Sequence, residues 1–451
     1  MIDWPEADQV FRVVLLRDHN TRVVLLGTSL LGATAGVVGS FMLLRKRALV
    51  GDVVAHAALP GIALAFILLE GLVPGAGRFL PALLAGAVLA GLAAMGSVLL
   101  LRRVPRIKED AALAIVLSVF FGLGIVLLTV VQGLPTGTAA GLNHYIYGKA
   151  ALMLTGDVWF IAAAALATLL TCGLLYKELS LLCFDESFAA AAGWPVIRLD
   201  AALMALIVAV TVIGLQSVGL LLVVAMLILP PAAARFWSDR LATTLPLAAV
   251  LGGMGAALGV LLSALFPRLA AGPVIVLSGT ALFGLSMVCG LRHGLLPRAV
   301  DRRRVRRRVG RHDLMRAAYE CVEHRDERLY PLAITATPLT FEDLRQRRRW
   351  SPRRLRRLLA AALAEGLLKR RGESWYLTRA GAEHARRATR NHRLWELYMV
   401  HYAEVAPSQI DRHADAIEHV LDPETVRDLE RLLGETGPRV PPSPHAIRET
   451  Q

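Results

Sequence analysis

Residues 51–61 read Gly-Asp-Val-Val-Ala-His-Ala-Ala-Leu-Pro-Gly, and they begin an apolar segment that continues to about residue 70. A segment of this length is typical of a helix that crosses the hydrocarbon core of a membrane, which is about 30 Å thick. Asp52 and His56 are four residues apart, so both side chains lie on one face of such a helix. This stretch therefore predicts a membrane protein with a polar pair inside one of its spans.

The pair has two interpretations. A carboxylate and an imidazole inside an apolar span are costly unless they are paired, hydrated or bound to a cation. The structural interpretation is an Asp–His hydrogen bond, or an Asp52 that caps the helix outside the bilayer. The functional interpretation is an oxygen and a nitrogen ligand for Mn²⁺, Fe²⁺ or Zn²⁺ in transit. Pro60-Gly61 is expected to break the helix behind the pair and to free backbone carbonyls beside a pathway.

Apolar segments recur along the first 300 residues. About nine are long enough to be candidate spans, and they lie near residues 23–43, 52–70, 79–101, 111–131, 156–176, 199–214, 217–234, 243–266 and 273–291. The sixth and seventh are short and could instead form one broken segment. The pattern predicts an all-α polytopic membrane domain over residues 1–295.

Basic residues in the loops predict the orientation of these spans. Clusters follow the first, third, seventh and ninth candidates, at Arg45-Lys46-Arg47, Arg102-Arg103, Arg235 with Arg240, and the run from Arg302 to Arg308. Cytoplasmic loops carry the excess of Lys and Arg, and these four loops alternate as they should if all of them are cytoplasmic. Nine spans then place the N-terminus outside and the C-terminal part of the chain in the cytoplasm.

The chemistry of the chain changes near residue 300. Of 50 Lys and Arg residues, 31 lie in residues 301–451, together with 22 of the 36 Asp and Glu residues. The net charge of +14 divides into +5 for the first part and +9 for the second. This composition excludes a single globular enzyme, a secreted disulfide scaffold and a disordered chain, and it indicates a membrane domain joined to a water-soluble, Arg-rich tail.

The first part resembles the permease subunits of zinc/manganese/iron ABC importers. The resemblance is carried by Gly39–Arg45, Ala48–Asp52, His56–Gly61, Asn143–Gly148, Phe184–Ala189 and Leu229–Ala234. It implies a divalent metal as substrate with no permanently bound cofactor, and it places Asp52 and His56 on the translocation path. It also implies three kinds of partner: a cytoplasmic ATPase, an extracytoplasmic metal-binding protein, and a second permease copy or paralogue.

The segment 177–199 lies in a loop that we place inside the cell. Residues 184–189, Phe-Asp-Glu-Ser-Phe-Ala, could form a short amphipathic helix, either as an ordinary interfacial helix or as a coupling helix that docks the ATPase. The resemblance favours ATPase coupling through Phe184, Asp185, Glu186, Ala189 and Gly193. The chain contains no G-x-x-x-x-G-K-[ST] sequence, so we expect a transport subunit, not an enzyme, with ATP hydrolysis in the separate partner.

The tail begins with a basic juxtamembrane linker, residues 296–311. Such a run directly inside a span contacts anionic lipid headgroups, although contact with nucleic acid is the alternative. Residues 312–388 then predict a winged helix-turn-helix: an amphipathic helix at 313–324, a helix capped by Thr340 with Asp343, a helix from Ser351-Pro352 through Leu368, and a hairpin that turns at Gly372. Arg353, Arg354, Arg356 and Arg357 are the candidate DNA contacts, unless the fold serves protein contacts only.

Residues 389–446 predict a helical domain for metal binding and dimerisation. His392 and Glu396 are one helical turn apart, and Asp415, Glu418 and His419 share a face by their spacing. Such residues could bind Mn²⁺ or Fe²⁺, or could be idle surface groups. Residues 312–446 resemble the iron/manganese-dependent repressor family, which implies a metal sensor built from Asp313, His392, Asp415, Glu418 and His419. Arg316, however, stands where manganese-type members place a carboxylate, and this departure weakens the expected site.

Together these features predict the permease subunit of an ATP-driven importer for Mn, Zn or Fe in a bacterial-type plasma membrane. The cytoplasmic tail is expected to sense metal and to regulate transport. The alternative is a membrane-anchored, metal-dependent DNA-binding regulator. The ligand types do not distinguish among the three metals.

Overall fold

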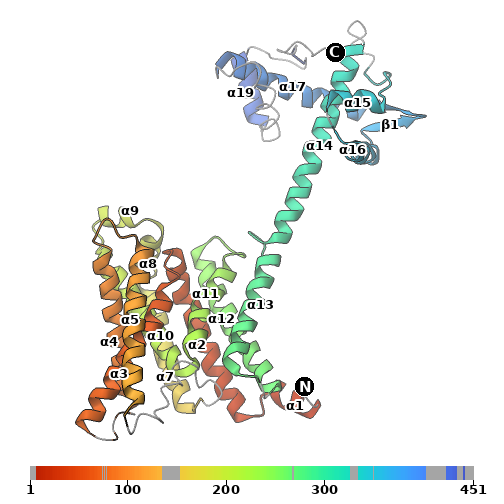
Figure 1. Cartoon of the computed structure of the whole chain (residues 1–451). Coiled ribbons are helices and arrows are strands. Elements are labelled where there is room, and N and C mark those ends of the chain that lie inside the picture. Colours follow the sequence, from red (N-terminus) through yellow and green to blue (C-terminus); the bar gives the residue numbers. More distant parts are fainter. Residues whose placement is uncertain are drawn as a thin grey trace. The chain divides into compact units, whose positions relative to one another are not determined.

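The computed structural model describes residues 7–441 except for 74, 76, 78, 135–152, 267–268, 326–333, 349, 403–422 and 434–439. The described residues fall into two units, Met1–Arg298 and Ala299–Gln451. Figure 1 shows the chain coloured along the sequence from red at the N-terminus to blue at the C-terminus.

Apolar sequence forms helices throughout the first unit. Eight of its described helices are long and apolar enough to cross a membrane: α2 (His19–Leu44), α3 (Val50–Leu72), α4 (Leu80–Leu101), α5 (Glu109–Gln132), α7 (Thr155–Leu174), α10 (Val196–Val218), α12 (Leu241–Leu265) and α13 (Ala271–Cys289). Four shorter helices accompany them: α1 (Ala7–Val14), α8 (Tyr176–Phe184), α9 (Glu186–Ala191) and α11 (Leu220–Ala234). The prediction of an all-α, multi-pass membrane domain is confirmed.

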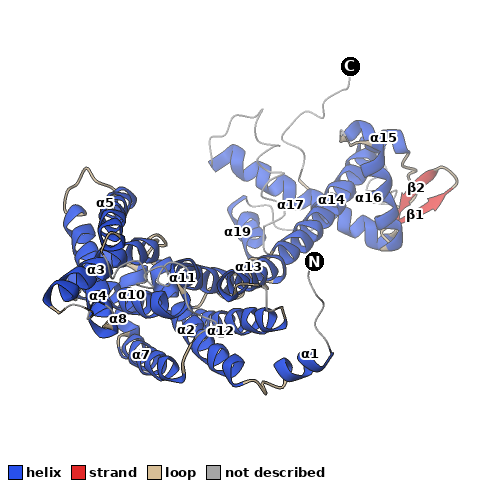
Figure 2. Ribbon diagram, turned by 60° about the horizontal axis from the view of Figure 1, so that its bottom comes forward, coloured by secondary structure: helices blue, strands red, loops and turns tan. Residues whose placement is uncertain are grey.

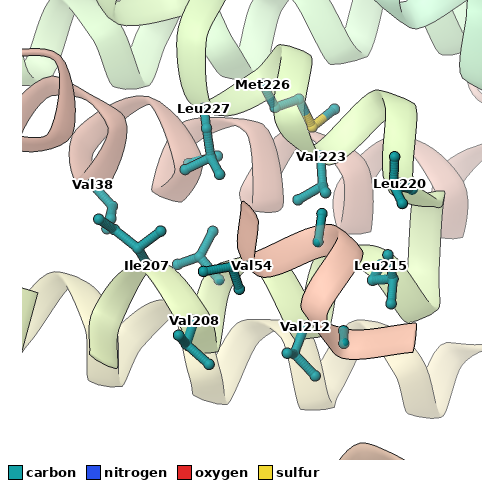
Figure 3. Close-up of a cluster of buried hydrophobic side chains, with 14 of the residues drawn as sticks. Val38, Val54, Ile207, Val208, Val212, Leu215, Leu220, Val223, Met226 and Leu227 are labelled. Atoms are coloured by element: carbon teal, nitrogen blue, oxygen red, sulfur yellow. The ribbon is translucent and has the colours of Figure 1, made fainter. Parts of the chain in front are cut away.

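The sixth and seventh predicted segments form a helical hairpin. Gly219 has a φ of 87° and ends α10, a conformation that costs glycine little because it has no Cβ. Figure 3 labels Val208, Val212 and Leu215 along α10, and it labels Leu220, Val223 and Leu227 along α11 in the opposite direction. The sixth segment is therefore longer than predicted, and the two are not one continuous span. The seventh is a helix of 15 residues, about 22 Å long and shorter than the hydrocarbon core.

Pro60 does not break its helix, contrary to the expectation from sequence. α3 continues through Pro60 to Leu72 because neighbouring helices pack tightly around this point. A Cβ added to Gly61 would lie 2.1 Å from the Gly86 carbonyl oxygen of α4, and one added to Gly124 of α5 would lie 3.0 Å from Pro60. Close approach of this kind is how small residues stabilise helix pairs in lipid. Pro60 still has no N–H to donate, so the carbonyl of His56 lacks its usual helical partner.

The second unit combines helices with one small sheet (Figure 2). Its elements are α14 (Leu295–Arg325), which begins at the end of the first unit, α15 (Phe341–Arg347), α16 (Pro352–Ala364), β1 (Leu368–Arg371), β2 (Ser374–Leu377), α17 (Arg379–Tyr402) and α19 (Pro423–Leu433). The strands are antiparallel, with Leu368 opposite Leu377, and Gly372 takes a φ of 63° in the turn.

Local sequence signals explain most of these boundaries. Thr340 and Asp343 form a reciprocal capping box at the start of α15, and the Ser351 side chain accepts from the Arg354 amide at the start of α16. Two boundaries differ from the prediction. α16 ends at Ala364 rather than Leu368, because Gly366 turns with a φ of 70°. The helix predicted at 313–324 begins earlier, because the basic run 296–311 belongs to the same helix as Asp313.

Candidate functional site

The polar pair lies in the first turns of α3. His56 Nε2 is 3.4 Å from Asp52 Oδ1, and the two side chains are 23% and 35% exposed. The one-turn spacing therefore brings them together as predicted. Asp52 lies in the first turn of the helix, where the helix dipole also favours a negative charge.

His56 keeps one ring nitrogen available. Its Nδ1 atom is buried and has no hydrogen-bond partner among the described residues, while its ring packs edge-on against Phe121 of α5 with centroids 4.8 Å apart. A buried imidazole nitrogen normally has a partner. The arrangement can therefore lend a nitrogen and a carboxylate oxygen to a divalent cation, with several coordination positions left for other ligands.

The expected coupling segment forms two short helices joined at Asp185. Asp185 accepts hydrogen bonds from the Ser187 hydroxyl and from the Phe188 amide, at 2.7 and 2.8 Å, so it caps α9. These bonds lower the pKa of the Asp185 carboxyl. Phe184 and Phe188 are exposed whereas Ala189 is buried, and Gly193 ends the turn with a φ of 83°. The segment thus exposes two aromatic side chains, while its buried Ala189 faces the protein interior.

A buried cluster of opposite charges holds this segment to the rest of the helical bundle. Asp200 of α10 is 4% exposed and accepts hydrogen bonds from Arg45 (3.3 Å), Arg47 and Arg102 (3.1 Å). Arg45 also donates to the carbonyl oxygen of Leu182 at 2.9 Å. The loop after α2, the end of α4, the end of α8 and the start of α10 therefore meet at one end of the bundle.

Two further carboxylates complete this cluster, which we call the Asp200 cluster. Glu186 of α9 is 2.9 Å from Arg45, and Glu109 at the start of α5 pairs with Arg47 and, at 3.7 Å, with Arg102. Three arginines thus face three carboxylates, and the buried charges are compensated.

Sequence reasoning missed Asp200. It used Arg45 and Arg102 only as indicators of orientation, and it read the sixth segment by its hydropathy. The available signal was a single carboxylate near the start of an apolar span, which is costly unless a partner lies close by.

The predicted metal sensor of the tail is only partly described. His392 and Glu396 are in contact, with Nε2 and Oε1 3.0 Å apart, and Asp313 lies on α14 as expected. Asp415, Glu418 and His419 lie outside the described residues, so their role as ligands stays a prediction. Arg316, the residue that departs from the expected pattern, is buried and donates to Nδ1 of His392.

The candidate DNA contacts lie on the predicted helix. Arg353, Arg354, Arg356 and Arg357 are all exposed on α16, whose Leu355 and Leu359 are buried in the core of the tail. In the adjacent hairpin, Arg370 and Arg371 pack over the rings of Trp375 and Tyr376. The arrangement gives a continuous helix face of positive charge beside a basic wing.

Two family models match this chain. The model of the ABC 3 transport family covers residues 17–290, which is more than half of the chain. A model described as the iron dependent repressor, metal binding and dimerisation domain covers residues 378–445.

Similar proteins cover one or both parts of the chain. The manganese transport system membrane protein MntC of Bacillus subtilis is 39% identical over 398 residues, 88% of each chain, so the similarity extends into the tail. The zinc transport system membrane protein TroC of Treponema pallidum is 42% identical over 291 residues, 64% of this chain and 96% of that one. The solved structure of PsaBC from Streptococcus pneumoniae in complex with Fab has a TM-score of 0.54 at 32% identity, covering 64% of this chain and 97% of that one.

Proposed function

Because the chain belongs to the ABC 3 transport family, we propose that it is the membrane permease subunit of an ATP-driven importer for a divalent transition metal, manganese or zinc. The observation that carries this function is the Asp52–His56 pair: two metal-ligand types one turn apart in an apolar helix, with a buried ring nitrogen that lacks a described partner. The names of the two relatives, one for manganese and one for zinc, support both metals.

The pair acts on the ion as a transient ligand. Two side-chain ligands fall short of the four to six that Zn²⁺ or Mn²⁺ takes, so the ion keeps water or gains ligands from elsewhere as it passes. An ion held at full coordination would bind too tightly to leave. The side chains of Asp52 and His56 are partly exposed, which is consistent with a second permease copy or paralogue that completes the path.

The energy for transport comes from a separate ATPase that docks on residues 184–193. Phe184 and Phe188 are exposed apolar anchors on this segment, and exposed aromatic side chains are common anchors of protein interfaces. The Asp200 cluster transmits motion of the segment to α5 and α10, because Arg45 and Arg47, in the loop before α3, pair with carboxylates of α9, α5 and α10. An extracytoplasmic metal-binding protein delivers the ion to the opposite end, and the basic end of the bundle faces the cytoplasm of a bacterial-type cell.

The deciding experiment is ion uptake by proteoliposomes that contain the chain together with its ATPase. Mn²⁺, Zn²⁺ and Fe²⁺ should be offered singly and in competition, with the metal-binding protein added outside. ATP-dependent uptake of Mn²⁺ or Zn²⁺ is the expected result. ATP-dependent uptake of none of the three ions would contradict the proposed function.

A second function, nucleic-acid contact by the tail, is favoured by the four exposed arginines of α16. Phosphate contacts make binding fall steeply with salt, by a slope of about 0.9 per neutralised phosphate. The affinity of the full chain in nanodiscs for duplex DNA should fall with such a slope as the salt concentration rises. The double substitution Arg353→Ala/Arg354→Ala should reduce this slope. Binding unaffected by this double substitution would remove α16 from the contact.

A further inference from the structure

A buried arginine joins the two longest helices of the tail. Arg316 of α14 is 2% exposed. Its guanidinium donates a hydrogen bond to Nδ1 of His392 on α17, and its Nε lies 3.3 Å from Oε1 of Glu320. His392 and Glu396 are equally buried, at 4% and 3% exposure. A permanent positive charge is thus buried between an imidazole and a carboxylate.

The proton positions at His392 follow from this contact. A guanidinium only donates, because it stays protonated in proteins. Nδ1 of His392 must therefore be the acceptor, and the ring proton must be on Nε2. Nε2 then donates to Glu396 Oε1 across 3.0 Å. Both ring nitrogens of His392 are engaged, and the imidazole is neutral.

These partners do not fit a divalent metal. A histidine ligand needs a ring nitrogen with a free lone pair, and here the guanidinium takes the lone pair of Nδ1 while Nε2 carries the proton. A divalent ion beside a buried guanidinium would also meet strong repulsion in a medium of low dielectric. Within the described part of the chain, no three His, Cys, Asp or Glu side chains are arranged to hold a metal ion.

The surrounding charges suit an arginine instead. Glu320 also faces Arg347, with 3.8 Å between Oε2 and Nε. Burial raises the pKa of Glu320, and the nearby Arg316 and Arg347 partly oppose this rise. On the same helix pair, Arg393 of α17 donates to both carboxylate oxygens of Glu323 of α14. Arginine–carboxylate pairs of this kind link helices with defined geometry and need no bound ion.

We propose that the Arg316 guanidinium is the resident cation of the tail, and that it links α14 to α17 in the place where a metal-binding domain would use a divalent ion. The tail is then a metal-independent module, although residues 378–445 match a model described as metal binding. Its surface, including the exposed arginines of α16, is available at every cytoplasmic metal concentration. This inference concerns the tail alone and does not depend on which ion the membrane domain carries.

Hydrogen exchange on the full chain in nanodiscs tests the proposal, because it reads α14 and α17 separately from the membrane domain. Peptides that cover residues 313–323 and 385–399 should exchange at the same rate, within about twofold, in EDTA, Mn²⁺ and Zn²⁺. Arg316→Met removes the cation and keeps the side chain long and apolar. It should speed exchange of both segments by at least about tenfold, whereas the exposed Arg353→Met should leave them unchanged.

Two results would overturn the proposal. Slower exchange of either segment on addition of Mn²⁺ or Zn²⁺ to the unmodified chain would mean that the ion, and not Arg316, stabilises the pair. Unchanged exchange in Arg316→Met would mean that the guanidinium does not link the two helices. The first measurement needs no substitution, so it stands even if the variant does not fold.

Discussion

At the scale of single residues, the two polar sites of the chain differ in the hydrogen-bond partners of their histidines. His56 and His392 each lie one helical turn from a carboxylate, and the sequence spacing of the two pairs is identical. Nδ1 of His56 has no described partner, whereas Nδ1 of His392 accepts from Arg316. The first pair can lend a ligand to an ion, and the second is already satisfied within the protein.

Asp52→Ala and His56→Ala should each abolish ATP-dependent metal uptake. Each removes one of the two proposed ligands, and the fold should survive because both side chains are partly exposed and neither is a fully buried charge. The measurement is uptake in proteoliposomes at matched reconstitution, with Asp110→Ala, an exposed carboxylate in the first turn of α5, as the control. Normal uptake by Asp52→Ala would remove the pair from the path.

At the scale of elements, charged groups and caps set how helices join. Asp200 pairs with arginines that lie 98 to 155 residues before it in the sequence, and Thr340 with Asp343 caps the start of α15. The first arrangement holds helices together at one end of the membrane domain, and the second holds the start of a helix in the tail.

Asp200→Asn should destabilise the membrane domain and uncouple ATP hydrolysis from transport. Removing one partner of a buried charge network costs about 3–5 kcal/mol, because the remaining charges stay buried without compensation. Thermal unfolding in detergent and the ratio of ATP hydrolysed to ion imported measure the two effects. Asp239→Asn, an exposed carboxylate that pairs with His293, is the control and should change neither. A variant with unaltered stability would show that the cluster is not a structural anchor.

Asp343→Ala should loosen α15 in a pH-dependent way. Burial alone would raise the pKa of Asp343, but its bonds with Thr340 and Arg325 outweigh burial and lower the pKa below its ordinary value of 3.8. The carboxylate therefore stabilises the tail fully above pH 3.8, and this contribution is lost as the pH falls further.

Hydrogen exchange of residues 341–347 checks this expectation. The substituted chain should exchange faster at pH 7 by an amount equivalent to about 1 kcal/mol, and the difference should shrink as the pH falls below 3.8 and the carboxylate becomes protonated. The neighbouring Glu342→Ala is the control. A difference that persists unchanged at acid pH would mean that the charge of Asp343 is not involved.

At the scale of the whole molecule, the basic loops of the membrane domain share one end. The Asp200 cluster brings together the loops that contain Arg45 and Arg102, and the Arg292 amide donates to the carbonyl oxygen of Phe236 in the loop after α11. This common end agrees with the alternation that the sequence predicts, while the side of the membrane that it faces stays a prediction.

Reporter fusions should locate that end. A reporter after Arg103 or after Arg292 should read cytoplasmic, and one at Gly75, between α3 and α4, should read extracytoplasmic. A pair of enzymes active on opposite sides of the membrane gives the readout. An extracytoplasmic signal at Arg292 would contradict the cytoplasmic placement of the tail.

The sequence by itself determined most of the apolar spans of the membrane domain, the capped starts of α15 and α16 and the pairing of Asp52 with His56. These features depend on hydropathy, on capping residues and on the 3.6-residue period, all of which act within a few residues of the chain. For the same reason the hairpin at Gly372 was predictable from its turn residue.

Only the tertiary structure decided which distant charges meet and whether a local signal, such as a proline, ends a helix. Pro60 lies inside a continuous helix, with Gly124 of α5 packed against it and Gly86 of α4 packed against the next residue, Gly61. Arg316 meets His392 across 76 residues, and Asp200 meets Arg47 across 153. Such partners are chosen by packing, since a buried charge must find compensation wherever the folded chain provides it.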